Sequence, residues 1–156
     1  MAVTAVVFDV GETLVDEARH AASGDPRRAF ATDDLRADAL PAIAALRERG
    51  LRVGAAGNMR TVHEAFLHEH VDAVGSSESW DAWKPSPEFF ARVAAMMGVE
   101  PTEIAYVGDR VDNDVMPSLA AGMTAVHIRR GGWTHQEPPP EAIRVGSLVE
   151  LAEVLP

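Results

Sequence analysis

Short apolar runs alternate with helix-forming segments along this chain, and this alternation restricts the folds that are open to it. We expect strands over 3–8, 51–56, 71–74, 103–107 and 124–128, with a short final strand over 143–145. We expect helices over 38–49, 61–70, 87–97, 112–121 and 148–154. Because strands that alternate with helices build βαβ units, the sequence predicts a three-layer, Rossmann-like α/β sandwich around a mainly parallel sheet of five or six strands.

The length of the chain suits one domain. Its 156 residues allow one well-buried core, whereas two domains of ordinary size need a longer chain. We therefore predict a single domain over 1–156. Segment 15–38 is polar and weakly periodic, so we expect it to form a loop with one short helix. We also expect loops over 75–87 and 129–140.

Charge and composition argue against several classes of partner. The chain has a formal net charge of −10 and no cysteine. Nucleic-acid backbones and anionic membrane surfaces attract basic proteins, so we expect neither as a partner. A chain without cysteine forms no disulfides and has no thiolate chemistry. Since no apolar run reaches about 18 residues, we expect a soluble, cytoplasmic protein.

Polar residues follow the predicted strands, at the edge where an open parallel sheet binds ligands. Asp9 follows the first strand, and Gly57 and Asn58 follow the second. Lys84, the only lysine in the chain, comes after the third strand, and Asp109 follows the fourth. One aspartate after a strand is an ordinary turn residue. Several such residues at one edge are expected to converge into a site.

A site of this kind suits phosphoryl transfer. Asp9 and Asp109 offer carboxylate oxygens to Mg²⁺, which binds one or two carboxylates together with waters and a substrate phosphate. Asp9 is also a candidate nucleophile, and Lys84 is a candidate partner for the phosphoryl oxygens. Backbone amides around Gly57 and Asn58 would meet the same negative charge. Because buried acids need a cation to offset their charge, the sequence implies a metal.

Four segments, in chain order, resemble the four motifs of the haloacid dehalogenase (HAD) superfamily. They are FDVGETL at 8–14, GAAGN at 54–58, KPSPEFF at 84–90, and VGDRVDNDV at 107–115 followed by AGM at 121–123. The resemblance implies a HAD-like hydrolase core in which Asp9 is the nucleophile and Lys84 orients it and the phosphate.

The resemblance also implies a cofactor and a reaction. The Mg²⁺ ligands would be Asp9, the backbone carbonyl of Gly11, Asp109 and Asp114. The activity would be hydrolysis of a phosphomonoester through an aspartyl-phosphate. The substrate would be a phosphorylated small molecule or a larger phosphorylated partner, with its phosphate held by Gly57, Asn58 and Lys84.

The chain departs from the motif pattern at three places. Gly11 stands where the family usually has an aspartate that protonates the leaving group, a role worth roughly 10²–10⁴-fold in rate. Glu12 is a candidate substitute, although we expect its side chain to point to solvent. Gly57 stands where a hydroxyl side chain usually binds phosphate. Segment 15–38 replaces the usual cap domain, so we expect an open site, which a neighbouring subunit of a homo-oligomer would be able to roof.

Three other functions compete with this one. Gly11 and Gly57 also fit a degenerate member that binds a phosphorylated ligand or partner without turnover. A carbon–halogen hydrolase needs no metal, which would leave the charges of Asp109 and Asp114 unused. A signalling receiver domain also combines acids with a lysine, but in a different order along the chain.

Two further groups of residues are given structural roles. His63 and His68 are five positions apart, whereas the metalloprotease helix needs four, so we expect them on a solvated helix face. Trp80, Trp83 and Trp133 lie in predicted loops near the proposed edge. We expect them to pack in the core or at an interface rather than to line the substrate pocket.

Overall fold

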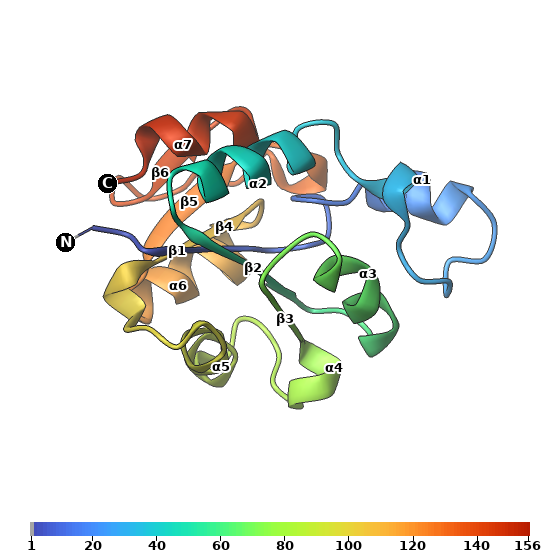
Figure 1. Ribbon diagram of the computed structural model, residues 1–156, viewed down its shortest axis with the longest axis horizontal. Coiled ribbons are helices and arrows are strands. Elements are labelled where there is room, and N and C mark those ends of the chain that lie inside the picture. Colours follow the sequence, from blue (N-terminus) through green and yellow to red (C-terminus); the bar gives the residue numbers. More distant parts are fainter. Residues whose placement is uncertain (1) are drawn as a thin grey trace.

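A six-stranded sheet with helices on both faces forms the centre of the molecule (Figure 1). The computed structural model describes residues 2–156. The strands are β1 (Ala5–Phe8), β2 (Arg52–Gly57), β3 (Ala73–Ser76), β4 (Ile104–Gly108), β5 (Thr124–Ile128) and β6 (Ile143–Val145). They lie in the order β3-β2-β1-β4-β5-β6, and every neighbouring pair is parallel. The predicted α/β fold is confirmed.

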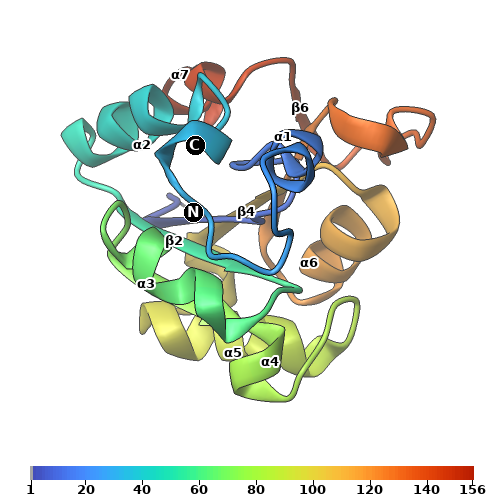
Figure 2. The same cartoon turned by 90° about the vertical axis from the view of Figure 1, so that its right-hand side faces the viewer.

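Helices cover the two faces of the sheet. They are α1 (Glu17–Ala22), α2 (Ala39–Glu48), α3 (Glu64–His68), α4 (Ser77–Trp80), α5 (Pro87–Met97), α6 (Met116–Ala120) and α7 (Leu151–Val154). Helices α2 and α7 lie on one face, and α5 and α6 lie on the other (Figures 1 and 2). Within residues 2–156, no helix has the length and apolarity needed to span a membrane.

Strand β1 is buried on both faces. Val6 and Phe8 join the core beneath α2, while Ala5 and Val7 join the core beneath α5. A strand with this double burial is apolar throughout instead of alternating. Its register pairs Phe8 with Ala55 on β2 and with Val107 on β4. The residues that follow these three strands therefore reach the same edge of the sheet.

Helix α5 covers the predicted range 87–97, because its end signals are strong. The side chain of Ser86 accepts a hydrogen bond from the backbone N of Glu88, and Pro87 occupies the first turn. Gly98 ends the helix in the left-handed conformation, with φ of 70°. Local residues alone are sufficient to set these boundaries.

Other predicted boundaries differ from the structure. Two predicted helices begin with a tighter 3₁₀ turn, which is Thr61–His63 for the helix over 61–70 and Leu148–Glu150 for the helix over 148–154. The helix predicted over 112–121 begins with a wider, π-helical turn, Val111–Val115. The predicted loop over 75–87 contains α4, whose start is capped by the Ser76 side chain accepting from the backbone N of Ser79. A helix this short shows no periodicity in the sequence.

Segment 15–38 lies beyond the carboxyl edge of the sheet, where Figures 1 and 2 show α1. It contains α1 and the 3₁₀ turn Thr32–Asp34, as predicted for a loop with one short helix. The ring of Phe30 stacks on the ring of His63 with centroids 3.6 Å apart, and the backbone N of Phe30 donates to His63 Nδ1 at 3.1 Å. The expectation of a solvated His63 is wrong, because this segment buries it.

Candidate active site

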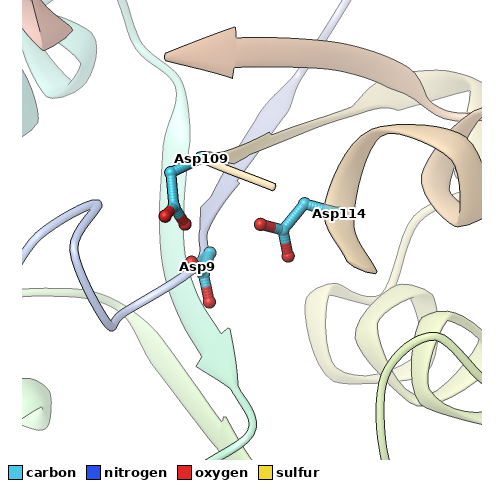
Figure 3. Close-up of side chains that lie close together, drawn as sticks. All are labelled: Asp9, Asp109 and Asp114. Carbon is cyan, nitrogen blue, oxygen red and sulfur yellow. The ribbon is translucent and has the colours of Figure 1, made fainter. Parts of the chain in front are cut away.

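Three aspartates meet at the carboxyl edge of the sheet (Figure 3). Asp9 follows β1, Asp109 follows β4, and Asp114 belongs to the π-helical turn Val111–Val115. Their exposed fractions are only 6%, 3% and 1%. One carboxylate oxygen from each lies within 4.8 Å of those of the other two. The structure therefore brings together the three acids that the sequence analysis singled out.

The ammonium group of Lys84 lies between two of these acids. Its Nζ is 2.6 Å from Oδ1 of Asp9 and 2.6 Å from Oδ1 of Asp114. The rings of Phe89 and Tyr106 lie 5.8 and 5.7 Å from the same nitrogen. Burial opposes the charged form, but the charges of Asp114 and Asp9 raise the pKa of Lys84 well above its usual value. The lysine is therefore positively charged.

Asn58 holds the main chain of Lys84 in place. Its Oδ1 accepts from the backbone N of Lys84 at 2.8 Å, and its Nδ2 donates to the carbonyl of Lys84 at 3.2 Å. Both polar atoms of the Asn58 side chain are therefore engaged. The side chain of Asn58 therefore positions the main chain of the lysine.

One lysine does not balance three buried acids. Burial and the nearby charges of Asp9 and Asp114 raise the pKa of Asp109 to about 9. Burial and Asp9 also raise the pKa of Asp114, to about 6, against the opposing effect of Lys84. Hard divalent cations prefer oxygen ligands such as carboxylates. The donor set of three converging carboxylates, with Gly11 lining the same pocket, fits Mg²⁺.

Two glycines allow the acids to approach so closely. A Cβ atom on Gly108 would lie 2.4 Å from Cγ of Asp114, so no larger residue fits there without displacing that carboxylate. A Cβ atom on Gly57 would lie 3.2 Å from Oδ1 of Asp9. Gly57 therefore leaves room around the Asp9 carboxylate, at the position where the motif that this segment resembles usually has a hydroxyl residue.

Glu12 is held by protein contacts, and the expectation that it points to solvent is wrong. It has a φ of 63°, an unusual conformation for a residue with a side chain. Its Oε1 accepts from the backbone N of Glu17 at 2.8 Å, and its Oε2 pairs with Nη2 of Arg36 at 3.1 Å. Because both oxygens are engaged, Glu12 is a poor substitute for the acid missing at Gly11.

A pocket of about 200 Å³ opens over the acids. It includes residues that the sequence analysis did not assign to a site: Glu17, Phe30, Met59, Arg110 and Asn113. Trp133 also lines it, against the expectation of a packing role, with the guanidinium of Arg110 lying 3.9 Å from its ring centroid. Trp80 packs against Phe89 as expected of a core residue, with ring centroids 5.3 Å apart.

Glu17 is the most consequential of the residues that the sequence analysis missed. Desolvation and the charges of Glu12 and Asp9 raise the pKa of Glu17, which reflects its closeness to the acids of the site. The N-cap at Asp16, whose side chain accepts from the backbone N of Arg19, was the available signal for the start of α1. That signal predicts where the helix begins but not that it lies against the pocket.

Comparison with known proteins finds a hydrolase family and several phosphatases that resemble this chain. The model of the haloacid dehalogenase-like hydrolase family matches residues 15–122, which include the second and third motif segments and residues 107–115 of the fourth. Glyceraldehyde 3-phosphate phosphatase of Methanopyrus kandleri is 36% identical over 107 residues, which are 65% of this chain and 46% of that protein. The protein of the same name from Methanocaldococcus jannaschii is 32% identical over 117 residues, which are 70% of this chain and 51% of that protein.

The chain spans about half the length of these curated relatives. Among solved structures, a HAD phosphatase from Thermococcus onnurineus superposes with a TM-score of 0.77 at 21% sequence identity. That superposition covers 99% of this chain and 97% of the other. At this identity the likeness establishes the fold, and the chemistry has to be argued from the residues of the site.

Proposed function

Since this chain belongs to the haloacid dehalogenase-like hydrolase family, we propose that it is a Mg²⁺-dependent phosphomonoesterase with Asp9 as its nucleophile. The observation that carries the proposal is the contact of Lys84 with both Asp9 and Asp114, beside Asp109. An acid cluster that served only for stability would gain little from burying three carboxylates around one lysine.

Both oxygens of the proposed nucleophile are oriented by neighbours. Lys84 contacts Oδ1 of Asp9, and the hydroxyl of Thr13 donates to Oδ2 at 3.2 Å. In the first step an Asp9 oxygen attacks phosphorus, the bond from phosphorus to the ester oxygen breaks, and an aspartyl-phosphate forms. In the second step water attacks the same phosphorus, which restores the Asp9 carboxylate and releases inorganic phosphate. Lys84 faces the negative charge of the phosphoryl oxygens throughout.

The proposed metal ligands are Asp9, Asp109 and Asp114, with the backbone carbonyl of Gly11. When bound, Mg²⁺ supplies positive charge that offsets the carboxylates and the substrate phosphate, so that anion and nucleophile can approach each other. The convergence of the three carboxylates within 4.8 Å supports this assignment.

We propose a small phosphorylated metabolite as the substrate. The two curated relatives are named for a three-carbon phosphate ester, and a pocket of about 200 Å³ suits a molecule of that size. We further propose that segment 15–38 takes the place of a cap domain, since it brings Glu17 and Phe30 to the pocket. A larger phosphorylated partner is the second substrate class to test.

A panel of phosphate esters assayed with and without Mg²⁺ tests the proposal. We expect Mg²⁺-dependent release of phosphate, and a loss of at least about 10³-fold for Asp9→Asn. Asp33→Asn, an exposed aspartate on segment 15–38, is the matched control and should keep full activity. Equal rates without metal, or in Asp9→Asn, would rule out the mechanism. Binding of phosphate esters without turnover would favour the alternative suggested by Gly11 and Gly57, a degenerate member that only binds.

A further inference from the structure

The Glu17 carboxyl group occupies the space beside Gly11 where a side chain would otherwise lie. A Cβ atom on Gly11 would stand 2.4 Å from Oε1 of Glu17 and 2.9 Å from its Cδ. Any residue other than glycine at position 11 would therefore have to displace Glu17. The two residues lie in the wall of the pocket that also contains Asp9 and Lys84. The carboxyl group of Glu17, at the start of α1, thus fills the space next to the loop that follows Asp9.

Contacts at the start of α1 hold Glu17 in this position. Its backbone N donates to Oε1 of Glu12 at 2.8 Å, and the other oxygen of Glu12 is paired with Arg36 at 3.1 Å. Asp16 caps the helix by accepting from the backbone N of Arg19 at 3.0 Å. The side chain of Glu12 is therefore used to fix the main chain of Glu17, while the carboxyl of Glu17 is free to face the pocket.

Glu17 differs from every other carboxyl group at the site. Asp9 and Asp114 contact Lys84, Asp109 is packed against both acids, and Glu12 has both oxygens engaged. The Glu17 side chain makes no hydrogen bond or ion pair with any residue in 2–156, and the residue is exposed at the pocket mouth. It is thus the carboxyl available to meet a substrate oxygen.

We infer that Glu17 donates a proton to the leaving oxygen of the substrate, an inference that rests on the proposed phosphomonoesterase function. An alkoxide is a poor leaving group, and a positioned carboxylic acid removes that difficulty by protonating it as the bond breaks. As the phosphorus–oxygen bond breaks, the proton moves from the Glu17 carboxyl to the ester oxygen. The products are a neutral alcohol, the aspartyl-phosphate and the Glu17 carboxylate. In the second step this carboxylate takes a proton from the attacking water, which restores the acid.

Leaving-group dependence tests the inference. The test compares Glu17→Gln with the unmodified protein in single turnovers with excess protein, so that release of the leaving group reports the first step alone. Nitrophenolate leaves without a proton, so its release from p-nitrophenyl phosphate should stay within about threefold. Release of glycerol from glycerol phosphate should fall by about 100-fold or more. Glu69→Gln, at an exposed glutamate outside the pocket, is the matched control.

The outcomes separate this inference from the function on which it rests. Equal losses for both substrates, or no loss for glycerol phosphate, would overturn the role of Glu17 while the phosphatase activity stands. Absence of Mg²⁺-dependent hydrolysis in the unmodified protein would overturn the proposed function and this inference with it. Thermal unfolding midpoints of Glu17→Gln and Glu69→Gln establish that both variants are folded.

A rescue variant provides a second, independent readout. Glu17→Ala empties the space beside Gly11, and Gly11→Asp in the same chain supplies a carboxyl from the other side. If position 17 serves as the proton donor, the double variant should release glycerol from glycerol phosphate at least about tenfold faster than Glu17→Ala does. A double variant no faster than Glu17→Ala on glycerol phosphate would contradict the assignment of Glu17 as the proton donor.

Discussion

Two regions of the chain contribute to the pocket, and different contacts hold them. One region is formed by the carboxyl ends of β1 and β4, and the other is segment 15–38. Asp9 is fixed by the sheet, since its backbone N donates to the carbonyl of Val107 at 2.8 Å and its side chain is buried. Glu17 is fixed by the side chain of Glu12 and by a segment packed through the Phe30–His63 stack. The proposed nucleophile therefore follows a buried strand, whereas the proposed proton donor lies on a connecting segment whose position depends on side-chain contacts.

This difference has a consequence for how the two parts respond to change. Substitutions in the buried cluster of three aspartates and Lys84 should lower the stability of the protein and its activity on every substrate, because the negative charges of the aspartates are then no longer offset. Damage to segment 15–38 should leave Asp9 in place and alter only the steps that need the segment.

The largest effect is expected for Lys84→Met, which removes the only cation within hydrogen-bonding distance of Asp9 and Asp114 among residues 2–156. Removing one partner of a buried ion pair typically costs about 3–5 kcal/mol, because the remaining charge is left uncompensated. We expect a fall of that size in the free energy of unfolding, measured by urea denaturation at neutral pH, together with loss of hydrolysis.

Mg²⁺ should recover part of the stability that Lys84→Met loses, since a cation bound only to the folded state stabilises it. Arg92→Met, which removes an exposed positive charge from α5, is the matched control and should change the free energy of unfolding little. A loss below about 1 kcal/mol for Lys84→Met would contradict the importance of the buried pairs.

The strand-end acids were predictable from the sequence because local and global signals agree there. β1 and β4 are apolar runs that end at an acid, and parallel pairing brings such ends to one edge. Helix α5 was likewise predictable over its full range because Ser86, Pro87 and Gly98 define its ends. These features depend on residues close together in the chain or on a simple topology.

The role of segment 15–38 was not predictable in the same way. The contact of Phe30 with His63 joins residues 33 positions apart, and neither residue has a pattern that indicates the other. The space that Glu17 occupies exists because Gly11 has no side chain, which the sequence shows only as a departure from a motif. Side-chain packing between distant residues decides such positions, and periodicity carries no information about it.

A smaller effect is expected from pH, through the histidine that anchors segment 15–38. Burial lowers the pKa of His63 from 6.5 to about 4, and its Nδ1 accepts a hydrogen bond that a protonated ring would lose. As pH falls below 6.5, the unfolded chain takes up this proton first, so the free energy of unfolding decreases until pH reaches about 4. The contribution of His63 should be about 1–3 kcal/mol over that window.

Comparison with His63→Asn isolates this contribution, because the other titrating groups are common to both proteins. The side-chain oxygen of asparagine can still accept from the backbone N of Phe30. We expect the variant to lose less stability than the unmodified protein between pH 6.5 and 4, as measured by denaturation at a series of pH values. Parallel pH curves for the two proteins would show that His63 is not the anchor that we describe.

The smallest effect is expected for Arg36→Met, which releases one oxygen of Glu12 and so loosens the link between the two regions. The pair is partly exposed, with side-chain exposed fractions of 26% and 20%, so the stability change should stay below about 1 kcal/mol. Because Glu12 positions the main chain of Glu17, release of glycerol from glycerol phosphate should slow by about threefold to tenfold. Release of nitrophenolate should be unchanged, since Asp9 and Lys84 do not touch Arg36. A variant that slows both substrates equally would show that the segment supports Asp9 as well, and that the two regions are not separable.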